Sequence, residues 1–133
     1  MKKMSYFFVF GFVATIIFHQ SALALLFLLG KFPSLPWNMS GVAPLGVPQV
    51  ISLSFFGGLW GIPLGLLSEK LSGSKYWLMS LGFGAVFPTA VAMLVVFPMK
   101  GIPVGIEKVI GGLYVNAVWG LGFAIQHKLF CKK

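Results

Sequence analysis

The chain has 133 residues, of which 58% are hydrophobic and 9% charged, and its formal net charge is +8. Soluble domains usually carry about 25% charged residues, and a fold this small leaves much of its surface in water. The composition therefore excludes a soluble globular domain, and its hydrophobicity excludes a disordered chain. It predicts an all-α integral membrane protein with a single transmembrane domain over residues 1–133.

Four apolar runs are each long enough to cross a bilayer, which takes about 20 residues. The segments between them are rich in Pro, Gly, Ser and Lys, as solvated connections are. The predicted transmembrane helices cover 4–29, 49–67, 76–97 and 109–126.

The first run resembles a secretory signal, because Lys2 and Lys3 precede it and a small-residue pattern occurs at 22–24. The apolar residues continue without a break to Leu29, however. We therefore expect an uncleaved helix that is long enough to span with tilt. Cleavage after Ala24 is the alternative.

The lysines predict the orientation of the four helices. The side with the N-terminus, the second loop and the C-terminus carries seven lysines, and the other side carries three. The positive-inside rule then places both termini in the cytoplasm of a cell, with a bacterial inner membrane as the expected location. Because these lysines account for the positive charge and the chain has no Arg, we expect no nucleic-acid partner.

The sequence matches itself at an offset of 59 residues, with six identities in 18 pairs between 44–61 and 103–120. The matches include Trp60-Gly61 over Trp119-Gly120 and a Pro-x-Gly turn before each helix. This pattern predicts two parallel helical-hairpin repeats related by an axis along the membrane normal. The alternative is that helix entries simply favour Pro and Gly.

Small residues recur four apart on the second and fourth predicted helices. The rows contain Gly57, Gly61 and Gly65 on one helix, and Gly112, Asn116 and Gly120 on the other. Such rows let helix backbones approach closely in lipid. They predict helix packing, either as a seam between the second and fourth helices or as an oligomer contact. The smooth wall of a narrow pore is the functional alternative.

Polar side chains within the apolar runs are costly in lipid and usually face protein or water. At about 1.5 Å per residue, one from each helix falls within roughly 6 Å of the midplane. This polar layer holds His19 with its neighbour Gln20, Ser54, Thr89 and Asn116. It predicts a shared interior site, with helix bridging as the alternative.

His19 is the titratable group of this layer. A neutral, hydrogen-bonded ring is expected, because no carboxylate lies within the predicted spans to stabilise the cation. A proton relay is the alternative. We further expect His19 and Asn116 to face the bundle interior, close enough to interact directly or through one water.

The sequence lacks the groupings that catalysis needs. Glu69 and Glu107 fall on opposite sides of the predicted membrane, about 30 Å apart, so they cannot form an acid–base pair. His19 and His127 differ in depth by roughly 15 Å, so they cannot both bind one metal ion, which needs three or four ligands close together. Cys131, the lone cysteine, is expected to be inert, and a reactive or lipidated thiol is the alternative. We expect no enzyme, metal or cofactor.

Two functions fit these features. The first is a channel or facilitator for a small solute, built from several copies because four short helices leave little interior room. The second is a non-catalytic accessory or structural subunit that packs against other membrane proteins. The expected partners are the lipid bilayer and either further copies of the chain or another membrane protein.

Overall fold

A computed structural model describes residues 1–131. The chain forms four helical rods, two of which contain a π-helical segment. The first rod runs through α1 (Lys2–Ala14), η1 (Thr15–His19) and α2 (Gln20–Leu28), and the second is α3 (Gln49–Ser68). The third combines α4 (Gly73–Val91), η2 (Ala92–Val96) and α5 (Phe97–Met99), and the fourth is α6 (Ile106–Phe130).

All four rods are long and apolar enough to cross a membrane, in agreement with the predicted segments. The all-α prediction is confirmed for these four rods. One addition was not predicted: β1 (Gly41–Val42) pairs antiparallel with β2 (Val47–Pro48) in the loop before α3. Strands this short form only a local hairpin in that loop.

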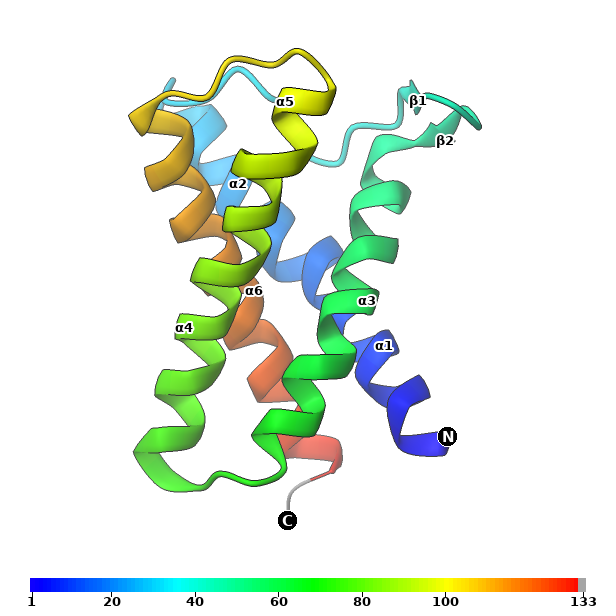
Figure 1. The fold of residues 1–133 in the computed structure, drawn as a ribbon, viewed down its shortest axis with the longest axis vertical. Helices are drawn as coiled ribbons and strands as arrows, with labels where there is room; N and C mark the ends of the chain where they lie inside the picture. Colours follow the sequence, from blue (N-terminus) through cyan, green and yellow to red (C-terminus); the bar gives the residue numbers. More distant parts are fainter. Residues whose placement is uncertain (132–133) are drawn as a thin grey trace.

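The rods pack as two hairpins (Figure 1). α1 packs mainly against α3, and α4 mainly against α6. The first rod runs obliquely across the bundle, so η1 and α2 lie against α6 and connect the two hairpins. The start of α1, the α3–α4 turn and the end of α6 share one end of the bundle, called the inner end below. The long loops lie at the opposite, outer end.

Aromatic side chains fill the centre of the bundle. The buried core contains Phe7, Phe10, Ala14, Leu64, Phe83, Trp119 and Phe123, which come from all four rods. Tilted and edge-on ring pairs recur among them, as between Phe10 and Phe123 at 6.1 Å. Because these large rings fill the space between the four rods, the interior of a single chain is closely packed.

The π-helical segment η1 keeps one face of the first rod buried. Residues five apart are hydrogen-bonded neighbours in a π-helix, as residues four apart are in an α-helix. Thr15 and Gln20 are five apart, and both are buried. The wider turn therefore carries the polar Gln20 onto the packed face that Thr15 begins.

Candidate functional site

The glycine row of α3 faces α1. It consists of Gly57, Gly61 and Gly65. A Cβ on Gly61 would collide with the carbonyl oxygen of Phe7 and lie 3.1 Å from the Cα of Gly11. A Cβ on Gly57 would strike Thr15, and one on Gly65 would strike the Phe7 ring. The two backbones meet here without side chains between them, so this crossing requires glycine.

The small residues of α6 face α4 in the same manner. A Cβ on Gly120 would collide with the carbonyl oxygen of Ser80 and lie 3.3 Å from the Cα of Gly84. Eight residues towards the outer end, a Cβ on Gly112 would lie 3.1 Å from the Thr89 methyl carbon. Each hairpin therefore has a glycine–glycine crossing of its own.

The expected seam between the second and fourth helices is wrong. The rows pack within each hairpin, and α3 makes little contact with α6. The physical reason is the small residue that each row meets on the facing helix. Gly11 on α1 lies opposite Gly61, and Gly84 on α4 lies opposite Gly120, so the backbones approach most closely within each hairpin.

Two members of the predicted polar layer bond to each other across the second hairpin. Asn116 Nδ2 on α6 donates to Thr89 Oγ1 on α4 at 2.8 Å. Ser54, fully buried on α3, instead donates to the carbonyl oxygen of Val50 in its own helix at 2.7 Å. The first contact bridges two helices, and the second satisfies a hydroxyl within one helix. Both agree with the alternative interpretation of the layer, in which its polar groups serve helix packing.

His19 and Gln20 form a second polar group with the outer loop. Gln20 is only 1% exposed, and its Oε1 accepts a hydrogen bond from the Trp37 backbone N–H at 2.7 Å. This bond fixes the amide orientation, so Nε2 faces His19 Nδ1 at 3.2 Å. Because an amide NH₂ only donates, His19 Nδ1 accepts, and the arrangement suits a neutral ring.

Trp37 anchors the loop to the first rod. Its indole Nε1 donates to the carbonyl oxygen of Ile16 at 2.8 Å, inside the π-helical segment. Its backbone lies in the left-handed region at φ 49°, which is uncommon for a bulky residue. The next residue, Asn38, donates from Nδ2 to Gln49 at the start of α3, at 3.0 Å. The loop thus ties the first rod to α3.

The polar layer therefore consists of two separate groups and of Ser54, which bonds within its own helix. In the part of the chain that the structure describes, no hydrogen bond joins His19 to Asn116; each bonds to another residue. The direct interaction that we expected between them is not formed. A polar side chain in a packed bundle bonds to the partner that its own rotamer and nearest helix offer, and depth alone does not select that partner.

A buried histidine–tyrosine pair at the inner end was not predicted from the sequence. Tyr76 on α4 and His127 on α6 are both buried, and Tyr76 Oη lies 3.0 Å from His127 Nδ1. The hydroxyl donates its single proton to the carbonyl oxygen of Ala124 at 2.7 Å, so Nδ1 of the histidine donates to the tyrosine. Phe7 and Phe123 enclose the histidine ring.

Tyr76 and its sequence neighbour Trp77 differ in burial. Tyr76 is 2% exposed, while its neighbour Trp77 remains partly accessible and lies 5.3 Å from the Lys128 ammonium. One available signal was the position of both Tyr76 and His127 near the inner ends of paired antiparallel helices. The sequence does not show that these two helices pair, so it does not bring the two residues together.

Among residues 1–131, no three His, Cys, Asp or Glu side chains gather in a way that could hold a metal ion. Cys131 follows α6 and is exposed. Partial burial raises the pKa of its thiol, and the Glu69 carboxylate raises it further, while Lys3 opposes both. A raised pKa leaves less thiolate at neutral pH, which favours the inert interpretation of this cysteine.

Comparisons with known proteins give no relative. The chain matches no protein-family model, no curated protein and no solved structure. The functional argument therefore rests on the residues and contacts described above.

Replacing either partner of the Asn116–Thr89 bond tests whether the layer serves helix packing. We expect Asn116→Leu and Thr89→Val each to lower the free energy of unfolding by about 1 kcal/mol, because each removes one hydrogen bond. Denaturation in micelles measures both. The free energy of unfolding of the double variant should fall by less than the sum of the decreases in the two single variants. Strictly additive losses would mean that the bond contributes nothing to stability.

Proposed function

We propose that the chain is a multi-pass membrane protein, with both termini in the cytoplasm, that acts without catalysis as an accessory subunit for another membrane protein. The expected location is a bacterial inner membrane. Four rods of suitable length and hydrophobicity support membrane insertion, and the excess of lysines at the inner end supports the orientation.

The observation that carries this proposal is the apolar character of the outer loops. Lipid explains exposed apolar side chains along the middle of the rods, but it does not cover the outer loops or the residues at the rod ends beside them. Leu45 in the β1–β2 turn is 84% exposed, and Met99 at the end of the third rod is 82% exposed. Leu35, Met39, Val104 and Ile106, from the loops and the start of α6 at this same end, are also exposed. Exposed apolar residues that lipid does not cover are typical of a protein-binding surface.

The interior of the bundle also supports a packing role. Aromatic rings fill the centre, and the polar groups at mid-depth bond within the chain. A solute path through one chain would need polar groups directed at an open lumen. A path between copies of the chain is the second candidate. The helices α3 and α4 make few contacts with each other, which leaves both open to a neighbouring copy and favours this candidate.

The internal contacts support the proposed duplication of the hairpin. The aligned glycines Gly61 and Gly120 each cross a glycine of the preceding helix. The aligned tryptophans both reach the first helix of the other hairpin. Trp119 Nε1 donates to the carbonyl oxygen of Gly11 at 3.0 Å, and the Trp60 ring lies 6.0 Å from that of Phe83, beside Gly84. This exchange is what a two-fold axis along the membrane normal would produce.

The outer loops do not share one turn, contrary to our expectation from the Pro-x-Gly match. Gly46 has φ +73° in the β1–β2 turn, three residues before α3 begins. Gly105 is the N-cap residue of α6, with an extended backbone. A duplicated hairpin whose first outer loop later lengthened would account for this difference, because loops tolerate insertion better than helices do.

A topology assay tests insertion and orientation. A phosphatase that is active only outside the cytoplasm should be inactive when fused after Lys133 and active when inserted after Ser40. The excess of inner lysines is the physical reason. The reverse pattern would contradict the orientation, and a leader cleaved after Ala24 would show as a mature chain that starts at Leu25.

Crosslinking in membranes, combined with solute flux, tests the function. We expect the chain to crosslink to a different membrane protein, with the yield falling when Leu45 and Met99 are changed to Ser. Leu78, exposed to lipid on α4, provides the matched control, and Leu78→Ser should leave the yield unchanged. A purified homo-oligomer that accelerates solute flux in liposomes would instead support the path between copies.

A further inference from the structure

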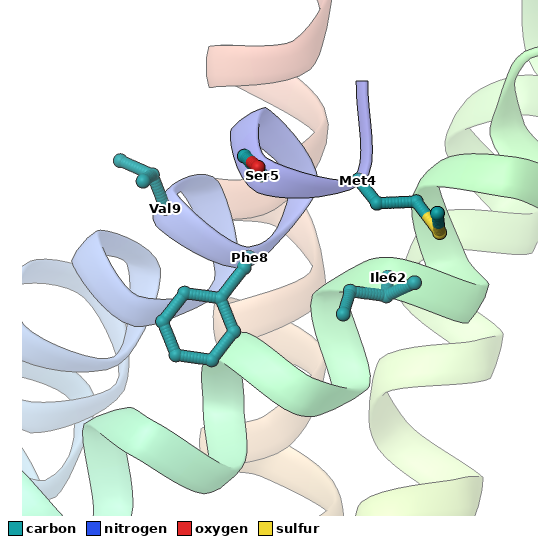
Figure 2. A pocket seen from close by; sticks show the side chains of 5 residues that line it. All are labelled: Met4, Ser5, Phe8, Val9 and Ile62. Carbon is teal, nitrogen blue, oxygen red and sulfur yellow. The ribbon is translucent and has the colours of Figure 1, made fainter. Parts of the chain in front are cut away.

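An apolar groove lies between α1 and α3 on the outside of the bundle (Figure 2). Its volume is about 340 Å³, and it is lined by Met4, Ser5, Phe8, Val9 and Ile62. Four of these residues belong to α1 and the last to α3. The groove occupies the half of the helix pair that is nearer the inner end.

Gly58 makes room for the Phe8 ring that lines this groove. A Cβ on Gly58 would lie 2.6 Å from the Phe8 ring, so the ring rests directly on the α3 backbone. The edge of the Phe55 ring holds it there, with the ring centres 5.7 Å apart. Ser5 is the polar residue of the lining, and its hydroxyl donates to the Met1 carbonyl oxygen at 3.4 Å. The groove therefore suits a hydrocarbon chain.

Positive charge lies at the inner end of the same two helices. Lys3 Nζ pairs with Glu69 Oε1 at 3.0 Å, which fastens the start of α1 to the end of α3. Glu69 is the one carboxylate side chain at this end, so among residues 1–131 its pairing with Lys3 leaves the neighbouring Lys2 and Lys70 without an acidic partner. Both lysines are exposed. Their charges are available to an anion at the membrane surface.

We propose that this groove binds one acyl chain of an anionic phospholipid of the inner leaflet, whose phosphate contacts Lys2 and Lys70. The site rests on the proposed membrane insertion and orientation. The apolar lining recognises the chain, and the unpaired lysines beside it select negative headgroups over zwitterionic ones. Neither feature alone would choose a lipid class. Together they match the two ends of one molecule.

The amounts of each lipid that stay bound to the protein after extraction measure this preference for negative headgroups. The protein is reconstituted in vesicles of equal phosphatidylglycerol and phosphatidylcholine, extracted in mild detergent and analysed by native mass spectrometry. We expect retained phosphatidylglycerol to exceed phosphatidylcholine by about fivefold or more, and Lys2→Gln with Lys70→Gln to reduce the ratio towards one. Lys75→Gln, which removes a charge at the start of α4, is the control and should keep most of the preference. Retention at the vesicle ratio by the unaltered chain would overturn the proposal.

Filling the groove tests the chain-binding half of the site. Ile62→Trp should lower the number of lipids retained per chain, whereas Leu78→Trp on the exposed face of α4 should not. Equal retention by both variants would overturn the site. If Ile62→Trp does not fold, Val9→Trp at the far side of the groove replaces it. Alkaline carbonate extraction of the same membranes reports insertion separately, so a soluble chain would contradict the proposed function rather than the lipid site.

Discussion

Replacing Gly61 or Gly120 with leucine should strongly destabilise the protein. At each position the first side-chain carbon would already collide with a carbonyl oxygen of the facing helix, that of Phe7 or that of Ser80. Overpacking usually costs about 1–3 kcal/mol, and a collision with backbone cannot be relieved by a rotamer change. We expect both variants to lose folded protein, measured by size-exclusion profile and by thermal unfolding in micelles.

Gly82 provides the matched control for these substitutions. It lies on α4, and nothing surrounds the position where its Cβ would be. Gly82→Leu should therefore leave the size-exclusion profile and the unfolding temperature nearly unchanged. Similar losses at Gly61 and Gly120 would agree with equivalent crossings in a duplicated hairpin. Tolerance of leucine at one of these two positions would contradict the equivalence.

Replacing Tyr76 with phenylalanine should also weaken the fold markedly. The change removes the hydroxyl that donates to the Ala124 carbonyl oxygen and that accepts from His127, and it leaves both of these buried groups without that bond. Leaving a buried polar group unsatisfied costs about 1–3 kcal/mol. We expect Tyr76→Phe to lower the free energy of unfolding by an amount in this range, measured by denaturant titration in micelles.

Tyr114 on α6 is the control of the same residue type. Its side chain is 37% exposed, and no hydrogen bond from its hydroxyl occurs among residues 1–131. Tyr114→Phe should therefore change the free energy of unfolding by less than about 0.5 kcal/mol. Equal effects of the two substitutions would mean that the Tyr76 pair adds little to stability.

Several parts of the candidate site could be predicted because they depend on single residues. Small residues at spacings of four mark the helix faces where backbones approach, and Gly57, Gly61, Gly112 and Gly120 do lie in helix contacts. Polar residues at mid-span were expected to bond to protein, as Thr89 and Asn116 do. Which helix each face meets was not predictable in this way, because a small-residue row is equally suited to any neighbouring helix.

The sequence by itself determined the four helices and their approximate positions, because the hydrophobicity of a run and its breakers are local properties. Their ends differ from the prediction by up to four residues, most of all at α6 (Ile106–Phe130), which was expected over 109–126. Only the tertiary structure decided the pairing of α1 with α3 and of α4 with α6, the burial of Tyr76 against His127, and the division of the polar layer into separate groups. These contacts join residues that are far apart in the sequence, and the oblique path of the first rod, which lies against both α3 and α6, brings the two hairpins together (Figure 1). Close packing of particular side chains and backbones decides such contacts, and the hydrophobicity of a run does not specify them.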